Sequence, residues 1–129
     1  MDGLHLTADL RGCAPAQPLM TDPEALRRLC LAEVQAAGLQ AVGELFHRFR
    51  QSEVAALQPS GITGVVLLAE SHLAVHTWPE LSAVTLDVYV CNFGADNSAR
   101  AHRLFDSLAQ AFGPASVERH RLQRGQTAQ

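Results

Sequence analysis

Hydrophobic and polar residues alternate in several short stretches of the chain, with the period of a β-strand that is buried on one face. Residues 4–10 alternate in this way, and so do residues 83–91, whose valine and leucine side chains share one face. Residues 42–49 alternate more weakly, and residues 64–69 form an apolar run that is typical of a central strand. The pattern therefore predicts strands spread along most of the chain.

Two other stretches carry hydrophobic residues at helical spacing. The first follows Thr21-Asp22-Pro23-Glu24, which offers a cap and a proline suited to the first turn, and we expect it to end at Gly38. The second follows Asp96-Asn97-Ser98 and should end at Gly113-Pro114. A short last strand is expected after this helix, and the polar chain from Arg119 onward is expected to be loose.

This order of elements predicts an α+β fold, a two-layer sandwich in which a largely antiparallel sheet is covered on one face by two helices. The other face of such a sheet either meets water or packs against a second protomer. With 129 residues, the chain is expected to form a single domain over residues 1–129.

The charged residues exclude some kinds of chemistry. The formal net charge is −3, so we expect no nucleic-acid partner. All ten basic residues are arginine, and without lysine the chain can form neither a pyridoxal phosphate (PLP) Schiff base nor a lysine-containing phosphate loop.

The cysteines and the apolar runs bear on the compartment. Cys13, Cys30 and Cys91 are odd in number and follow no metal-binding spacing, which favours a reducing cytoplasm. The longest uninterrupted apolar run, Val65 to Ala69, is far shorter than the roughly 20 residues needed to cross a bilayer. We therefore expect a cytoplasmic protein with no membrane contact.

Polar residues with useful chemistry gather just after the apolar run, in residues 70–80. His72 and His76 would share one face of a helix and could bind a metal, although their neighbours favour a strand. Ser71 could be a hydrolytic nucleophile, but it lacks the flanking glycines of a nucleophile elbow. Taken alone, the same residues could also be ordinary strand and turn positions.

Residues 69–80 read Ala-Glu-Ser-His-Leu-Ala-Val-His-Thr-Trp-Pro-Glu; Gly-Ile-Thr-Gly-Val-Val precedes them at 61–66, and Cys91 follows at the end of a strand. This combination resembles the small prokaryotic S-adenosylmethionine decarboxylase proenzymes, most densely from Gly61 to Cys91. A missing lysine is no obstacle in this family, because its members build a pyruvoyl group from their own backbone, without PLP and without a metal.

The resemblance implies self-cleavage between Glu70 and Ser71. The Ser71 hydroxyl would attack the Glu70 carbonyl, and His76 would act as the base that lets the resulting ester open. The products would be a β chain of residues 1–70 and an α chain of residues 71–129 that begins with the pyruvoyl group. Thr63 stands where many relatives have a serine that supports processing, and it keeps the hydroxyl.

The resemblance also implies roles in turnover. Cys91 matches the residue that protonates the decarboxylated substrate, and Trp78 and Glu80 resemble positions that bind the adenine and the ribose. Two departures from the family concern recognition of the substrate. Leu57 stands near the position of an aromatic residue that contacts the adenine, and its loss would weaken that contact. The sequence after Cys91 is also altered, and there Phe93 could compensate for the missing aromatic residue.

The function expected from this resemblance is decarboxylation of S-adenosylmethionine, which supplies the aminopropyl donor for spermidine, by a homodimer of cleaved protomers, (αβ)2, with sites at or near the protomer interface. A pyruvoyl-dependent ornithine or arginine decarboxylase on the same fold is an alternative, and it would need a carboxylate for the distal cation of the substrate. An uncleaved regulatory homologue is a second alternative, although it would have no need for Ser71, His76 and Cys91 together.

Overall fold

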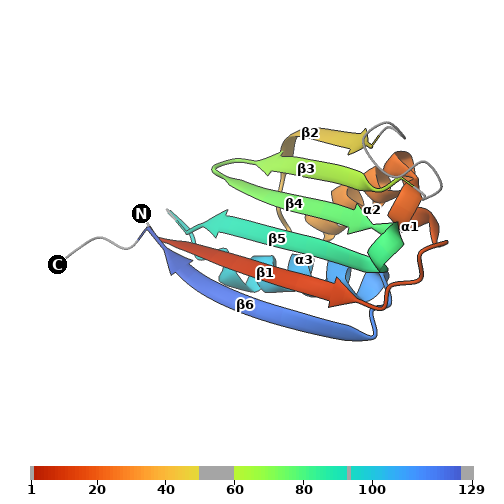
Figure 1. The fold of residues 1–129 in the computed structure, drawn as a ribbon. Coiled ribbons are helices and arrows are strands. Elements are labelled where there is room, and N and C mark those ends of the chain that lie inside the picture. Colours follow the sequence, from red (N-terminus) through yellow and green to blue (C-terminus); the bar gives the residue numbers. More distant parts are fainter. Residues whose placement is uncertain (1, 50–59, 93, 126–129) are drawn as a thin grey trace.

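A computed structural model describes residues 2–49, 60–92 and 94–125 of the chain. Within these ranges six strands form one sheet in the order β2-β3-β4-β5-β1-β6, and each neighbouring pair is antiparallel (Figure 1). The strands are β1 (Gly3–Arg11), β2 (Ala41–Arg48), β3 (Ile62–Leu68), β4 (Ser71–Trp78), β5 (Ala83–Cys91) and β6 (Ser116–Arg124).

The helices of the described residues are α1 (Pro18–Thr21), α2 (Pro23–Ala36) and α3 (Ser98–Ala111). The two long helices lie side by side behind the sheet in Figure 1, and they bury their apolar stripes against one of its faces. The expected α+β sandwich is therefore confirmed, and one short helix, α1, is added to the two helices that the sequence predicted. None of the helices in the described ranges is long and apolar enough to cross a bilayer.

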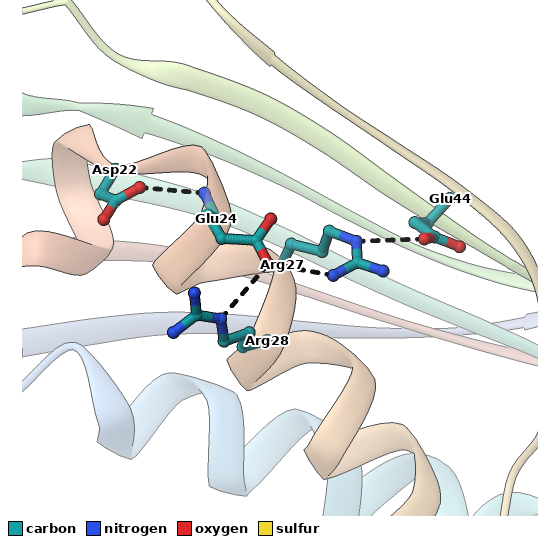
Figure 2. A network of polar contacts seen from close by, with 5 residues as sticks. All are labelled: Asp22, Glu24, Arg27, Arg28 and Glu44. Carbon is teal, nitrogen blue, oxygen red and sulfur yellow. Dashed lines mark hydrogen bonds and ion pairs between the residues drawn. The ribbon is translucent and has the colours of Figure 1, made fainter.

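The start of α2 is fixed by the residues that the sequence indicated. Asp22 caps the helix by accepting a hydrogen bond from the Glu24 N–H at 3.0 Å. The Glu24 carboxylate contacts both Arg27 and Arg28 at 3.2 Å, and Arg27 also reaches Glu44 on β2 at 3.1 Å (Figure 2). This network joins the helix to the outer strand, although each exposed ion pair contributes little stability.

Strand alternation gives the sheet a buried face and an open face. Leu73 and Val75 on β4 point into the core with the helices, as does Thr77, which is fully buried. The Thr77 hydroxyl accepts from the Ile62 N–H at 2.8 Å and donates to the Met20 carbonyl at 2.7 Å, so this buried polar group is satisfied. The neighbouring residues of β4, which include His72 and His76, lie on the open face.

The expectation of a loose chain from Arg119 onward is wrong. Residues 116–124 form β6, which pairs with β1 along nine residues. No alternation marks this strand in the sequence, because it lies beyond the helices and every residue of it is exposed. Arg119 helps to hold it, since its guanidinium contacts Asp106 at 2.7 Å and lies 5.2 Å from the centre of the Phe105 ring.

Candidate functional site

A tight turn joins β3 and β4. Leu68 pairs with Ser71, so only Ala69 and Glu70 make the turn, and both are exposed. Glu70 has a φ of 59°, a left-handed conformation that is costly for a residue with a side chain. The peptide bond between Glu70 and Ser71 therefore lies on an accessible turn next to a strained residue.

The Ser71 hydroxyl lies against the end of β5. Its Oγ accepts a hydrogen bond from the Cys91 N–H at 3.0 Å, which links residues that are 20 positions apart. The β4–β5 ladder ends at the pair of His72 and Tyr89, so the Cys91 main chain has no strand partner on that side. The structure thus brings together Ser71 and Cys91, two of the residues that the sequence singled out.

A cavity of about 560 Å³ opens beside Ser71. Its lining includes Glu70 and Ser71, the candidate metal ligand His72, and two polar side chains that the sequence did not single out, Tyr89 and Arg124. The Arg124 guanidinium lies 5.7 Å from the centre of the Tyr89 ring, and the His72 ring lies 5.6 Å from it. The end of β6 therefore contributes a cation to the surroundings of Ser71.

His5 on β1 supports this wall of the cavity. Its ring lies edge-on to His72 and to Tyr89, at centroid distances of 6.3 and 6.0 Å. Its Nδ1 lies 3.4 Å from Arg124 Nη1, and its buried Nε2 faces Asp87 at 3.9 Å, beyond hydrogen-bond distance. Burial lowers the pKa of His5 below its ordinary value, although the Asp87 carboxylate opposes this. Burial of the ring therefore disfavours the charged form of His5.

A second cluster lies at the opposite end of β4. The Thr63 hydroxyl is 3.1 Å from His76 Nδ1, and the His76 ring is stacked with Trp78 at 6.4 Å. The Phe49 ring also lies near Trp78, with a distance of 6.1 Å between the ring centres. Phe49 was missed because nothing in the sequence places the end of β2 beside the end of β4, two strands away in the sheet. Glu80 follows Trp78 in a short 3-10 turn and is exposed.

The two clusters are not brought together within one chain. Ser71 and His76 are five residues apart on one extended strand, which separates them by about 16 Å. An odd spacing also places them on opposite faces of the sheet. His72 and His76 share the open face but lie about 13 Å apart, too far to bind one metal ion in a single chain.

Two positions that depart from the resembled family, Leu57 and Phe93, lie outside the described residues. Asn92, between Cys91 and Phe93, is described, and its Nδ2 donates to Ser98 Oγ at 3.2 Å. Its Oδ1 accepts from the Asn97 N–H at 2.8 Å. The altered sequence after Cys91 thus makes specific contacts with the start of α3.

Comparison with known proteins identifies relatives along nearly the whole chain. A family model described as S-adenosylmethionine decarboxylase matches residues 4–125. An S-adenosylmethionine decarboxylase proenzyme of Hydrogenobaculum is 36% identical over 123 residues, which cover 95% of this chain and 81% of the relative. One of Archaeoglobus fulgidus is 32% identical, with 95% and 97% covered. The crystal structure of the adenosylmethionine decarboxylase from Aquifex aeolicus matches with a TM-score of 0.81 and 33% identity, covering 98% of this chain and 92% of that one.

Proposed function

Because the chain belongs to the S-adenosylmethionine decarboxylase family, we propose that it releases CO2 from S-adenosylmethionine after cutting itself between Glu70 and Ser71. The observation that carries the proposal is the position of Ser71. Its hydroxyl lies at an exposed turn, hydrogen-bonded to Cys91 and open to a cavity. A serine that cleaves its own chain needs an accessible peptide bond, and a catalytic group that replaces it needs a cavity for the substrate. The position of Ser71 offers both.

Self-cleavage begins with attack of Ser71 Oγ on the Glu70 carbonyl carbon. The bond from that carbon to the Ser71 nitrogen breaks, and an ester replaces the amide. A base then removes the α-proton of Ser71, and Oγ departs as part of the new carboxylate of Glu70. The enamine left at position 71 tautomerises to an imine. Water then hydrolyses the imine, which releases ammonia and leaves a pyruvoyl group. The left-handed Glu70 supports this step, because cleavage of the turn releases its conformational strain.

The residues around Ser71 fit a pyruvoyl group. The cavity beside it is lined by His72, Tyr89 and Arg124, so a substrate carboxylate and amine would meet polar side chains there. The pyruvoyl carbonyl supplies the electron sink that decarboxylation of an amino acid needs. Cys91 lies next to the same position and has a thiol suited to deliver the proton that replaces CO2. No lysine of the chain could supply such a sink by binding PLP.

The base for self-cleavage comes, in this proposal, from a second copy of the chain. His76 is the matching residue, but it lies about 16 Å along β4 from Ser71 in the same chain. Ser71 lines a cavity together with His72 and Tyr89 of the open face, so a twofold dimer that packs open face on open face brings His76 of the partner subunit to this cavity. The exposed side chains of Leu45 and Leu67 on this face support such packing, because they are 69% and 50% exposed in a single chain.

The second cluster provides the adenosine-binding part of the shared site. Trp78 and Phe49 offer two aromatic rings within 6.1 Å of each other, at a tilt of 33°, for contact with the adenine or the sulfonium. Glu80 follows them in the chain and is exposed, so its carboxylate is free to accept hydrogen bonds from the ribose hydroxyls. Phe49 supplies the aromatic contact expected to be weakened by Leu57.

The test is release of CO2 by the purified protein from S-adenosylmethionine, ornithine and arginine, supplied separately. The proposal predicts release from S-adenosylmethionine alone and none from the Ser71→Ala variant. Release from ornithine or arginine without release from S-adenosylmethionine would show that the substrate is wrong. A cleaved protein that releases no CO2 from any of the three would contradict the assigned activity.

A further inference from the structure

Asn97 precedes α3 at the position of a helix cap, but its side chain does not cap the helix. Asp96 performs that role, since its Oδ1 accepts from the Ser98 N–H at 2.9 Å, and the hydrogen bonds from Ser98 hold the pKa of Asp96 below its ordinary value. The Asn97 Nδ2 instead donates to the Cys91 carbonyl at 2.9 Å. Its Oδ1 accepts from Arg100 Nη1 at 2.7 Å, so both ends of the amide are fixed.

The Cys91 main chain depends on side chains for its hydrogen bonds. The Asn92 N–H donates to the Asp2 carbonyl at 2.7 Å, toward β1, so the polar groups of Cys91 point to the other side, toward β4. The β4 ladder has already ended there. The N–H of Cys91 is satisfied by Ser71 Oγ and its carbonyl by Asn97 Nδ2, so these two side chains replace the missing strand.

Self-cleavage removes one of these two contacts. Ser71 Oγ leaves with Glu70, and the Cys91 N–H loses its acceptor in the mature enzyme. The contact from Asn97 does not depend on Ser71. We propose that Asn97 is a positioning residue that holds the Cys91 main chain, so that the thiol protonates the α-carbon of the substrate and not the carbon of residue 71. This inference rests on the proposed function, because it assigns the proton delivered to Cys91.

Delivery of the proton to the wrong carbon has a distinct chemical product. Water then releases the former α-carbon of the substrate as an aldehyde, while the substrate nitrogen stays on residue 71 as the amino group of alanine. CO2 leaves as in the normal reaction, and no external oxidant or reductant is needed, because the pyruvoyl carbonyl accepts the electrons that the substrate carbon loses. Each such event inactivates one site, so the mass of the α chain records it.

The experiment compares Asn97→Asp with Asp96→Ala in the full chain. Aspartate matches asparagine in size, is an equally good residue at a helix start and keeps an acceptor for Arg100, so Asn97→Asp removes the amide donor and adds one negative charge beside that guanidinium. Asp96→Ala removes the cap of the same helix without touching Cys91. After equal release of CO2 from S-adenosylmethionine, mass spectrometry measures the fraction of α chains that begin with alanine. A second readout, without substrate, is hydrogen exchange at residues 91–92 of the cleaved protein.

We expect Asn97→Asp to raise the alanine fraction by about fivefold and to speed exchange at residues 91–92 by a similar factor, as for the loss of one hydrogen bond. Asp96→Ala should lower the melting temperature and leave the alanine fraction unchanged. Cys91→Ser serves as the reference. If Cys91→Ser raises the alanine fraction and Asn97→Asp does not, the role of Asn97 is wrong. If neither raises it, Cys91 is not the proton donor. Absence of cleavage in the wild-type chain would instead refute the proposed function itself.

Discussion

Ser71 and His76 lie on the same strand, β4, on opposite faces of the sheet and about 16 Å apart along it. Ser71 contacts Cys91, and His76 contacts Thr63, so each belongs to a separate cluster. No change of rotamer closes such a distance. If both residues take part in one self-cleavage reaction, two copies of the chain must each contribute one of them.

Co-expression of Ser71→Ala and His76→Ala chains tests this sharing. Neither variant should cleave alone. Random pairing makes half of the dimers mixed, and each mixed dimer contains one site with an intact Ser71 and an intact histidine from the partner, so about one quarter of all chains should be cleaved. Gel electrophoresis of the co-expressed protein measures this fraction.

The matched control is co-expression of Ser71→Ala with Cys91→Ala, where Cys91 lies in the same cluster as Ser71. If cleavage needs only Ser71 and a histidine from the partner, the Cys91→Ala chain keeps its own Ser71 and meets an intact His76 on every partner, so it should be cleaved fully. Complete absence of cleavage in the mixture of Ser71→Ala and His76→Ala would show that the two residues do not act across an interface.

Thr63→Val should slow self-cleavage. The Thr63 hydroxyl lies 3.1 Å from His76 Nδ1, and valine keeps the shape but removes this contact, so the imidazole loses a group that orients it. We expect the cleavage rate of Thr63→Val to fall by about tenfold, the effect of losing one hydrogen bond. Thr63→Ser keeps the hydroxyl and should cleave at the rate of the wild type. The measurement is the time course of cleavage after synthesis in a cell-free system. Equal rates for valine and threonine would exclude a processing role for Thr63.

Trp78 is the only tryptophan of the chain, so its fluorescence reports on the second cluster directly. Titration of the uncleaved Ser71→Ala protein with S-adenosylmethionine should quench this fluorescence with a saturating curve. Phe49→Leu should weaken binding by about tenfold, the effect of losing one stacking contact with a base. S-methylmethionine, a sulfonium without adenosine, should cause little quenching. Unchanged affinity in Phe49→Leu would place the adenine elsewhere.

His5 should make the stability of the protein depend on pH. Burial lowers the pKa of His5 in the folded state, whereas in the unfolded state it is about 6.5. As the pH falls below about 6.5, the unfolded state therefore takes up a proton at His5 before the folded state does. The free energy of unfolding is therefore unaffected by His5 above about pH 6.5, and it decreases as the pH falls from there toward the pKa of His5 in the folded state. His5→Gln should therefore reduce the drop in melting temperature between about pH 7.5 and pH 5.

The groups that face His5 are Asp87, His72 and Arg124, and the first of these favours protonation while the other two oppose it. His102→Gln is the control for the pH experiment, since His102 is exposed on α3 and lies outside this cluster. An equal reduction of the pH-dependent drop by His102→Gln, or no reduction by His5→Gln, would contradict the role of His5.

The buried half of the fold was predictable because it follows simple periods. On β5, for example, Val84, Leu86 and Val88 point into the core as the alternation predicted. The Asp22 cap of α2 was also readable in the sequence. The edge strand β6 was predictable only as a short last strand and not over its full length, because all of its residues are exposed and no buried face imposes an alternation on its sequence.

The site was predictable in part. Ser71 and Cys91 were singled out, and the structure joins them by a hydrogen bond. The contribution of Arg124 was not foreseeable, because it reaches His5 across 119 positions of sequence through the β1–β6 pairing. The separation of Ser71 from His76 follows from an odd spacing on a strand, and it is apparent only once residues 71–78 are known to be one continuous strand.

Self-cleavage is tested most directly by the intact mass of the denatured wild-type protein, compared with that of Ser71→Ala. The account predicts two chains for the wild type, residues 1–70 with a free carboxylate at Glu70 and residues 71–129 without a free amino terminus. It predicts one chain of 129 residues for Ser71→Ala. A wild-type protein that decarboxylates S-adenosylmethionine as a single uncleaved chain would contradict the account.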